Sequence, residues 1–239
     1  MGSGETRSDL ARRSFLSRIG AGAAAFGAAF AATSAAAGAQ APAVPVTPFQ
    51  PARHAEDDWF EQVPAKHRVF FDTTGAHGFG EAIFVANNTF TANRTGYGLT
   101  DADMALIICA RHESTPFAYT DAMWAKYGGA LAQRAADFSD PKTKQPPTIN
   151  VFQAAGYGAS LANQGVLLDA VLKRGTRLAV CALATRAAAS LIARQTGATV
   201  DDVFKELTEH LVPNAHMVPA GIVAVNRAQE HGYSFSYVA

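Results

Sequence analysis

The sequence predicts an α/β protein with a doubly wound, mostly parallel five-stranded sheet and helices on both of its faces. Short apolar, β-favouring runs alternate along the chain with longer segments whose apolar residues recur at helical spacing. The run "DMALIICARHE" is apolar through its centre, which is typical of a strand buried on both faces of a parallel sheet. Strands that alternate with helices, without an internal repeat, are joined by crossovers and therefore pair in parallel.

The first two strands and their helices are predicted between residues 66 and 128. Residues 69–71 form a β-favouring run that ends in a polar turn with a glycine. A helix follows, with Ile83, Asn87 and Phe90 at helical spacing and Gly96 as its stop. The apolar strand comes next, and "YTDAMWAKYGG" predicts a short helix closed by its two glycines.

Residues 128–152 interrupt this alternation. They contain the polar, proline-rich run "SDPKTKQPPT", for which we expect a loop insertion without a core face. The alternation then resumes. A helix is predicted over "LANQGVLLDAVLKRG", then a strand over "RLAVCAL" and a helix from Ala182 to Thr196. Thr199 caps the next predicted helix, with Asp202 at the capping-box position. The last predicted elements are a strand over 214–218, a helix from Pro219 to Gly232 and the edge strand "YSFSYV".

The first 39 residues predict a cleavable twin-arginine signal. Arg12 and Arg13 precede bulky apolar residues, a weakly hydrophobic Ala/Gly stretch and the small-residue site Ala37-Gly38-Ala39. A membrane anchor is the alternative, but Ala and Gly contribute little transfer free energy, so no stable anchor is expected. The predicted location is the periplasm, reached in the folded state. Residues 40–65 hold five prolines and predict an extended arm with room for one turn, and residues 66–239 form the predicted domain.

The charge balance suggests neither a nucleic-acid nor a membrane partner. The chain has 20 basic and 20 acidic residues, and four arginines and two acids precede residue 40, so the remainder carries a formal charge of −2. Two cysteines are too few for a disulfide scaffold. About 200 residues are enough for one domain with a substantial core.

Candidate chemistry lies at three strand ends, where doubly wound sheets bind ligands. Cys181 ends the third strand and begins a helix, whose positive N-terminus favours a thiolate. Core packing is the alternative role for Cys181. His112 and His77 are candidate general acid/base or orienting groups beside this nucleophile. The candidate substrate-binding residues are Thr73, Thr74 and Arg111.

Other kinds of site are less favoured. Cys109 lies inside an apolar run and predicts a core residue. In the common strand order the first strand separates the second from the third, which would place Cys109 too far from Cys181 for a disulfide. Cys109 and His112 would point to opposite faces of a strand, and His210, His216 and Met217 form no matching cluster. No metal site and no cofactor is therefore predicted, although export in the folded state is compatible with a metal. The glycines of "GAHGFGEA" fit neither a dinucleotide fingerprint nor a phosphate loop, and no Gly-x-Ser-x-Gly occurs.

Two segments resemble the DsrE/DsrF-like family of small α/β proteins linked to sulfur relay. "LLDAVLKRGTRLAVCALATRAAA" is similar to its helix, strand and cysteine-bearing turn. "NAHMVPAGIVAVNRAQEHGYSFSYV" is similar to its closing strand, "VPAG" turn, helix and final strand. The opening "VFFDTTGAHGFGEAIFVANN" fits more loosely. The resemblance covers about residues 66–239, and the insertion and the proline-rich arm depart from the family pattern.

The resemblance implies a doubly wound sheet, assembly into trimers or hexamers, and a persulfide carried at the position of Cys181. Tyr233, Phe235 and Tyr237, on one face of a terminal strand, also favour a homo-oligomer. The leading hypothesis is a periplasmic protein that handles sulfane sulfur or thiols through Cys181, with a periplasmic sulfur or redox partner. The alternative is a non-catalytic oligomeric module that binds a small ligand, a metal or a periplasmic partner.

Overall fold

The computed structural model describes residues 49–239, and residues 51–239 form one compact unit. The predicted signal, residues 1–39, and the first part of the predicted arm lie outside the described residues. Among the described residues, no helix combines the length and the apolar character that crossing a membrane requires.

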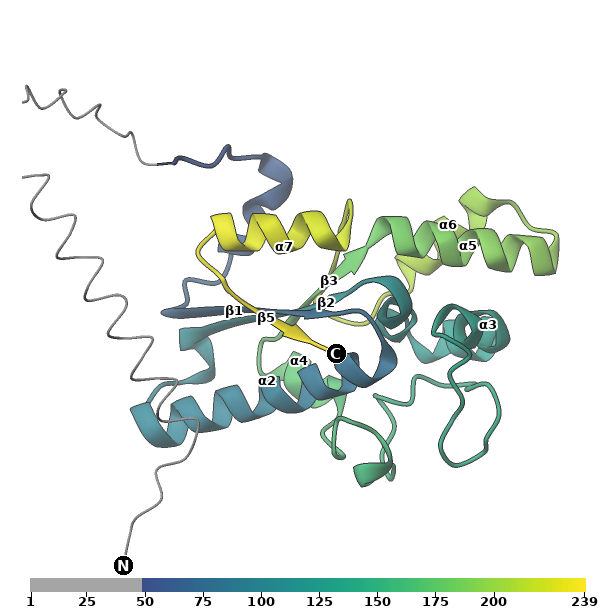
Figure 1. The fold of residues 1–239 in the computed structure, drawn as a ribbon, viewed down its shortest axis with the longest axis horizontal. Helices are drawn as coiled ribbons and strands as arrows, with labels where there is room; N and C mark the ends of the chain where they lie inside the picture. Colours follow the sequence, from purple (N-terminus) through teal and green to yellow (C-terminus); the bar gives the residue numbers. More distant parts are fainter. Residues whose placement is uncertain (1–48) are drawn as a thin grey trace, which may run out of the picture. The chain divides into compact units, whose positions relative to one another are not determined.

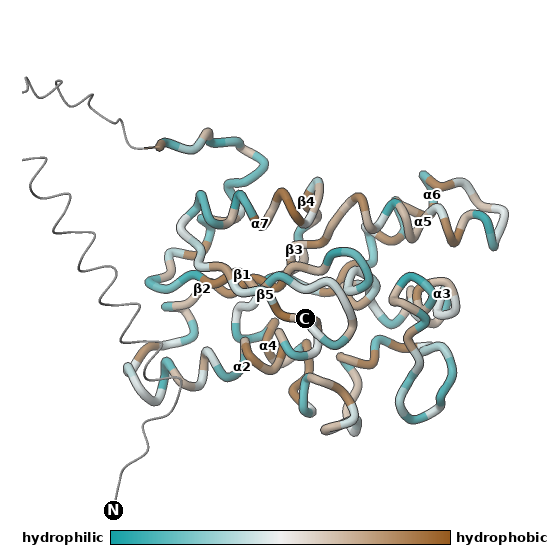
Figure 2. Tube along the Cα trace, in the orientation of Figure 1, coloured by the Kyte–Doolittle hydropathy of each residue, from teal (hydrophilic) through white to brown (hydrophobic). Residues whose placement is uncertain are grey.

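A five-stranded, all-parallel sheet forms the centre of this unit and confirms the predicted α/β fold (Figure 1). Every residue of the second strand is buried, as its continuous apolar run predicted. In Figure 2 the strand residues at the middle of the sheet are mainly brown, the colour of hydrophobic residues. The strands are β1 (His67–Thr73), β2 (Met104–Ala110), β3 (Arg177–Cys181), β4 (Ala215–Val218) and β5 (Ser234–Val238), and their order in the sheet is β4-β3-β2-β1-β5.

This strand order corrects the expectation that β1 lies between β2 and β3. Strand β2 pairs directly with β3, and Cys109 is in register with Ala179, two residues before Cys181. Adjacent parallel strands with this offset hold the two cysteine Cα atoms roughly 8 Å apart, still too far for a disulfide. Both thiols are free. The prediction failed because strand order depends on which face each crossover takes, and this is not a local property of the sequence.

Helices cover both faces of the sheet. Figure 1 shows α2 and α4 on one side and α7 on the other, while α5 and α6 lie together near α3. The segments that join β1 to β2 and β2 to β3 pack on the same face of the sheet, and the strands from β1 to β4 follow one another across the sheet in chain order. Helix α7 then crosses the opposite face of the sheet, and β5 pairs on the other side of β1. The helices are α2 (Ala76–Tyr97), α3 (Asp121–Arg134), α4 (Leu168–Lys173), α5 (Ala182–Thr196), α6 (Val200–Glu209) and α7 (Gly221–Glu230), with short 3₁₀ segments η1 (Ala55–Glu61), η2 (Asp101–Asp103), η3 (His112–Ala118) and η4 (Gly158–Ser160).

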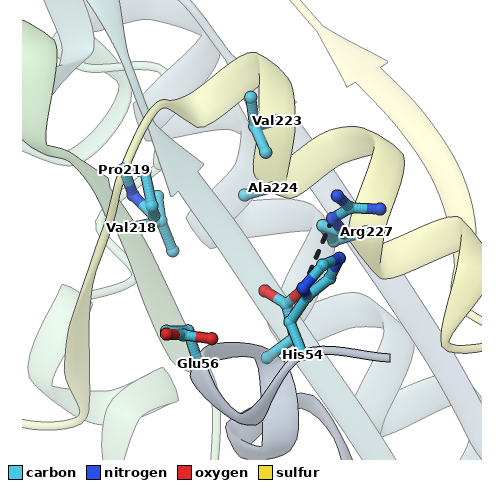
Figure 3. Close-up of a pocket in the computed structure, with 8 residues that line it drawn as sticks. His54, Glu56, Val218, Pro219, Val223, Ala224 and Arg227 are labelled. Atoms are coloured by element: carbon cyan, nitrogen blue, oxygen red, sulfur yellow. Dashed lines mark ion pairs between the residues drawn. The ribbon is translucent and has the colours of Figure 1, made fainter. Parts of the chain in front are cut away.

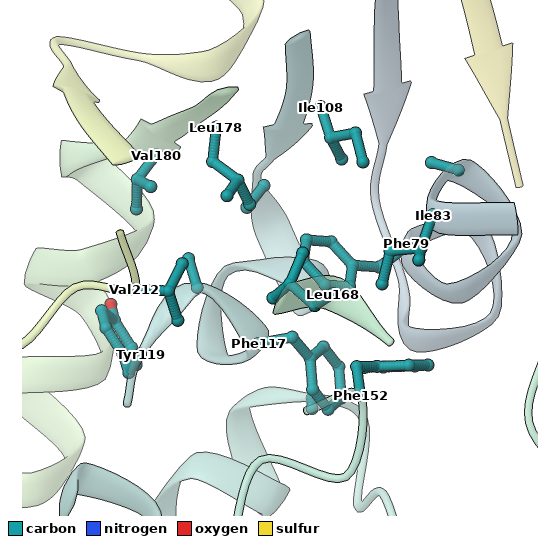
Figure 4. Packing of buried hydrophobic residues seen from close by; sticks show 14 of the residues in the cluster. Phe79, Ile83, Ile108, Phe117, Tyr119, Phe152, Leu168, Leu178, Val180 and Val212 are labelled. Atoms are coloured by element: carbon teal, nitrogen blue, oxygen red, sulfur yellow. The ribbon is translucent and has the colours of Figure 1, made fainter. Parts of the chain in front are cut away.

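The larger core lies between the sheet and α2 (Figure 4). Phe79 and Ile83 of α2 pack toward Ile108 of β2 and are fully buried. Phe117 and Phe152 lie beside them, with ring centroids 4.9 Å apart in an edge-to-face arrangement. Such buried aromatic pairs stabilise a core beyond the area that they bury.

The predicted insertion, residues 128–152, does have a core face, contrary to expectation. Helix α3 kinks at Tyr127, whose φ of −126° and ψ of 19° are not helical, directly before the two glycines that were expected to close it. Helical structure then resumes and runs to Arg134, and Val151 and Phe152 are buried. Gly128 also serves a close approach, because a Cβ there would overlap the carbonyl oxygen of Pro147. The helix predicted from residue 161 begins only at Leu168.

A smaller core on the opposite face is formed by α7, η1 and the adjoining strands. Trp59 and Phe60 of η1 are buried in it, so this part of the proline-rich segment is integral to the unit. Tyr233 is buried there too, and its hydroxyl donates a 2.7 Å hydrogen bond to the Phe60 carbonyl. Only Phe235 and Tyr237 of the predicted aromatic face are therefore exposed, at 45% and 54%.

Candidate functional site

A cavity of about 370 Å³ lies at the carboxyl ends of β2, β3 and β4. Helix α5 follows β3 into the larger core, whereas α7 follows β4 into the smaller one, so the two helices diverge at this point. Ligands of open parallel sheets bind where successive crossovers take opposite faces. The lining residues are Arg111, His112, Arg134, Cys181, Leu183, Ala184, Ala187, Ala220, Gly221 and Ile222.

Cys181 is positioned by the junction of β3 and α5. It caps the helix, and its Sγ accepts a hydrogen bond from the Ala184 N–H at 3.4 Å. Its carbonyl accepts from the Thr185 hydroxyl at 3.0 Å, and Tyr119 in turn donates to that hydroxyl at 2.9 Å. The side chain and the backbone of Cys181 are therefore both held. An N–H donor at a helix N-terminus stabilises negative charge on sulfur.

Arg111 is held at the cavity by Asp72 of β1. Its Nε donates to Oδ1 at 2.6 Å and its Nη2 donates to Oδ2 at 2.7 Å. This hydrogen bonding raises the pKa of Arg111, although partial burial opposes the shift. Asp72 is only 2% exposed, so the pair is a largely desolvated, bidentate ion pair that fixes the guanidinium plane.

Gly221 lets the first turn of α7 approach this ion pair. A Cβ at Gly221 would lie 2.6 Å from Cβ of Arg111 and 3.1 Å from Sγ of Cys109. Real Cβ atoms do not approach another carbon this closely, so only glycine fits here without a shift. The glycine of the "VPAG" turn therefore has a packing role in this chain.

Arg134 and His112 complete the polar wall of the cavity. Arg134 ends α3 and makes no ion pair within residues 49–239. His112 follows Arg111 with a φ of 53°, a left-handed conformation that is uncommon for a residue other than glycine. Strained backbone of this kind is found at ligand-binding sites.

The structure brings three of the six predicted site residues together: Cys181, His112 and Arg111. His77 lies elsewhere, on α2, where its Nδ1 is 3.2 Å from the Ala239 carbonyl. Thr73 is buried and donates to the Cys109 carbonyl at 2.7 Å, so it ties β1 to β2. Thr74 hydrogen-bonds Tyr237 at 3.1 Å.

Cys109 is the core residue that the sequence predicted. It is fully buried, and burial raises the pKa of its thiol well above the usual value, with the charge of Asp72 adding to the shift. A thiolate is therefore disfavoured at Cys109. Of the two cysteines, only Cys181 lines one of the described cavities.

Two residues of the site were not predicted from the sequence. Arg134 was missed because α3 was expected to end at Gly128 and Gly129, although the following "ALAQR" is favourable to a helix. Asp72 was not among the predicted site residues. Alternation along β1, β2 and β3 places Asp72, Cys109 and Cys181 on the face that α7 covers, a relation that the correct strand order would have shown.

A second cavity, of about 360 Å³, lies between η1 and α7 (Figure 3). Arg227 of α7 forms an ion pair with Asp57 there, with Nε 3.4 Å from Oδ2. Val218, Pro219 and Ala224 supply an apolar wall. No cysteine lines this cavity, so it is the weaker candidate for thiol chemistry.

No group of three or more metal-ligating side chains occurs within residues 49–239. His210 and His216 serve local packing: Nδ1 of His210 is 2.9 Å from the Glu206 carbonyl, and His216 stacks on Trp59 with ring centroids 4.5 Å apart. Comparison with models of known protein families, with curated proteins and with solved structures finds no significant match. What the site can do therefore follows from its own geometry and charge.

Proposed function

We propose that this protein handles sulfane sulfur or thiols through Cys181. The observation that carries the proposal is the placement of the Cys181 Sγ at a cavity wall, where the first turn of α5 donates an N–H to it. Cys181 as a whole is only 7% exposed, so the cavity is the route by which a small molecule reaches it. An N–H donor at a helix N-terminus is the environment of reactive cysteines. The resemblance of this turn to the cysteine-bearing turn of the DsrE/DsrF-like family supports the same function.

In the proposed reaction, the Cys181 thiolate attacks a sulfane sulfur of a donor. The sulfur–sulfur bond of the donor breaks, its electron pair leaves with the rest of the donor, and Cys181 becomes a persulfide. An acceptor thiolate then attacks the outer sulfur, and the electron pair of the broken bond returns to Cys181. The exposed His112 is the residue proposed to protonate a leaving group, while Arg111, fixed by Asp72, orients the donor.

Intact-mass spectrometry after incubation with inorganic polysulfide tests this function. We expect native protein to gain the mass of one sulfur atom, the Cys109→Ala variant to do the same, and Cys181→Ser to gain none. Serine is a good helix cap, so the Cys181→Ser variant should keep its fold, which a thermal melt checks. A native protein whose thiol stays inert would overturn the proposal and favour a non-catalytic module that binds a small ligand, a metal or a periplasmic partner.

We further propose that the protein works in the periplasm, on the basis of the twin-arginine pattern at Arg12 and Arg13. Replacing both arginines with lysine should leave uncut precursor in the cytoplasm. Cell fractionation with an antibody to the protein measures this, and normal export of the double variant would exclude the twin-arginine route.

A further inference from the structure

We infer that the Cys181 cavity is an anion-binding pocket, and that the sulfur donor it accepts is a small anion such as thiosulfate. The inference about the donor rests on the proposed function, whereas the inference about anion binding does not. Both inferences depend on the charge of the cavity wall, on the unpaired hydrogen-bond donors at that wall and on the volume of the cavity.

The cavity wall is cationic. Arg111 and Arg134 both line it, and no Asp or Glu within residues 49–239 does. The Asp72 carboxylate accepts hydrogen bonds from Nε and Nη2 of Arg111. Nη1 of Arg111 has no protein acceptor among the described residues. Arg134 has no carboxylate partner in the same part of the chain. A guanidinium without a partner at a cavity wall attracts an anion and can bind it through two parallel hydrogen bonds.

The backbone adds further donors. Helices α5 and α7, of 15 and 10 residues, both begin at this cavity. No side chain caps α7, so the N–H groups of Gly221 and Ile222 lack a side-chain acceptor within the described residues. Helix N-termini carry a partial positive charge and free N–H groups, which is the environment that anions prefer. The two arginines and the two helix termini therefore act in the same direction.

The space fits a small molecule. Its volume of about 370 Å³ lies in the lower part of the range of ligand pockets. Leu183 and Ile222 line the same cavity and are 66% and 60% exposed, so apolar side chains flank its mouth. A low-polarity rim strengthens the attraction between the guanidinium groups and an anion that reaches them. Cys181 lines the same cavity, so an anion held there would have its sulfur near Sγ.

Thiosulfate satisfies these requirements and needs no further reactant. The Cys181 thiolate attacks the outer sulfur of thiosulfate, the sulfur–sulfur bond breaks, and sulfite leaves with the electron pair. Cys181 is left as a persulfide, and the total charge is unchanged. A thiolate and a dianion repel each other in the absence of counter-charge. Asp72 already balances the charge of Arg111, so the charge of Arg134 and the partial positive charges of the two helix N-termini offset that repulsion.

A pair of alkylating reagents tests the anion pocket without reference to sulfur transfer. Iodoacetate is anionic and iodoacetamide is neutral, and both modify thiolates. We expect Arg134→Gln to lower the ratio of the iodoacetate rate to the iodoacetamide rate at Cys181 by about fivefold, as one partly screened charge would. Peptide mass spectrometry reads the modification at Cys181. The matched control is Arg194→Gln, an arginine in the last turn of α5 away from the cavity, which should leave the ratio unchanged.

Inorganic sulfate provides a second measurement. It should slow the alkylation of native Cys181 by iodoacetamide and protect the Arg134→Gln variant much less. An equal rate ratio in native protein and Arg134→Gln, together with no protection by sulfate, would overturn the anion pocket. If Cys181 forms a persulfide from polysulfide but lacks the anion preference, this inference fails alone. If the preference is present and no persulfide forms from polysulfide or thiosulfate, the proposed function fails and the anion pocket stands.

Discussion

At the scale of single residues, the Asp72–Arg111 pair organises the candidate site. Asp72 leaves β1 pointing to the face that α7 covers, and its two hydrogen bonds set the guanidinium at the end of β2 before any ligand arrives. Removing one partner of such a buried pair costs about 3–5 kcal/mol, because the other charge is left without a partner. The cavity therefore depends on a charge from a strand that does not itself line it.

Gly221 gives the sharpest prediction at this scale. Gly221→Ala should lower the free energy of unfolding by about 1–3 kcal/mol, because the new methyl group would overlap Arg111 and force α7 or β2 to shift. Urea unfolding followed by circular dichroism measures the change. Gly129→Ala is the matched control: Gly129 lies inside α3, a Cβ there would meet nothing within 4 Å, and its substitution should be neutral or stabilising. Equal effects of the two substitutions would contradict the close-approach role of Gly221.

At the scale of elements, helix ends were predicted best where a side chain marks them. Helix α5 spans Ala182–Thr196, as predicted from the sequence, and α6 begins directly after Thr199. The Thr199 hydroxyl accepts from the Asp202 N–H at 3.1 Å and donates to the Asp202 carboxylate at 2.7 Å. Elements without such a marker were predicted less well: α3 resumes after a kink at Tyr127 and runs to Arg134, and α4 begins several residues later than expected.

Thr199→Ala should lower the free energy of unfolding by about 1 kcal/mol, because the Asp202 N–H would lose its side-chain acceptor. Thr208→Ala in the last turn of the same helix is the control. The Thr208 hydroxyl bonds back to the Phe204 carbonyl, an arrangement that alanine replaces without loss. Chemical unfolding of both variants gives the comparison, and a cap role for Thr199 requires that its variant be clearly the less stable.

At the scale of the whole molecule, the part of the chain before β1 is tied to the sheet through η1. Trp59 stacks on His216 of the edge strand β4, and Arg177 donates to the Trp59 carbonyl at 2.6 Å. Arg53 and Glu61 both contact His231, just after α7. Residues 51–61 thus connect to β3, to β4 and to the segment that precedes β5, so this segment contributes to the stability of the whole unit.

Acid should weaken this connection through His216. Burial lowers the pKa of His216 below its ordinary value of 6.5, and the charge of Arg177 adds to the shift. Below that ordinary value the unfolded chain therefore binds the proton more readily than the folded one, and the free energy of unfolding falls as the pH falls toward the lowered pKa. We expect His216→Gln to flatten this decline between about pH 7.5 and about pH 5, measured by urea unfolding. Thr208→Ala, which removes no titratable group, should leave the decline unchanged.

Assembly is the second prediction for the whole molecule. We propose a homo-oligomer, a trimer or a dimer of trimers, because Phe235 and Tyr237 on the edge strand β5 and Leu183 and Ile222 beside the cavity are exposed apolar side chains. Light scattering on the protein without residues 1–39 should give a multiple of the monomer mass. The Phe235→Glu variant, which changes an exposed side chain, should have a lower mass than the native protein. Ser234→Glu, at an exposed position on the same strand, is the control and should keep the native mass. A monomer at micromolar concentration would contradict the proposal.

Local sequence patterns were enough to establish the fold class, the place of most strands, both ends of α5, the start of α6, and the position of Cys181 at a strand-to-helix junction. These features depend on the spacing of apolar residues and on caps within a few residues, so a short stretch of chain contains the information that specifies them. Other features became visible only in the folded chain: the strand order, the burial of Trp59, Phe60 and Tyr233, the contact of Gly221 with Arg111, and the gathering of Arg111, Arg134 and Cys181 around one cavity. They depend on which face of the sheet each crossover takes. That choice is made by the packing of the whole chain, and no short stretch of sequence records it.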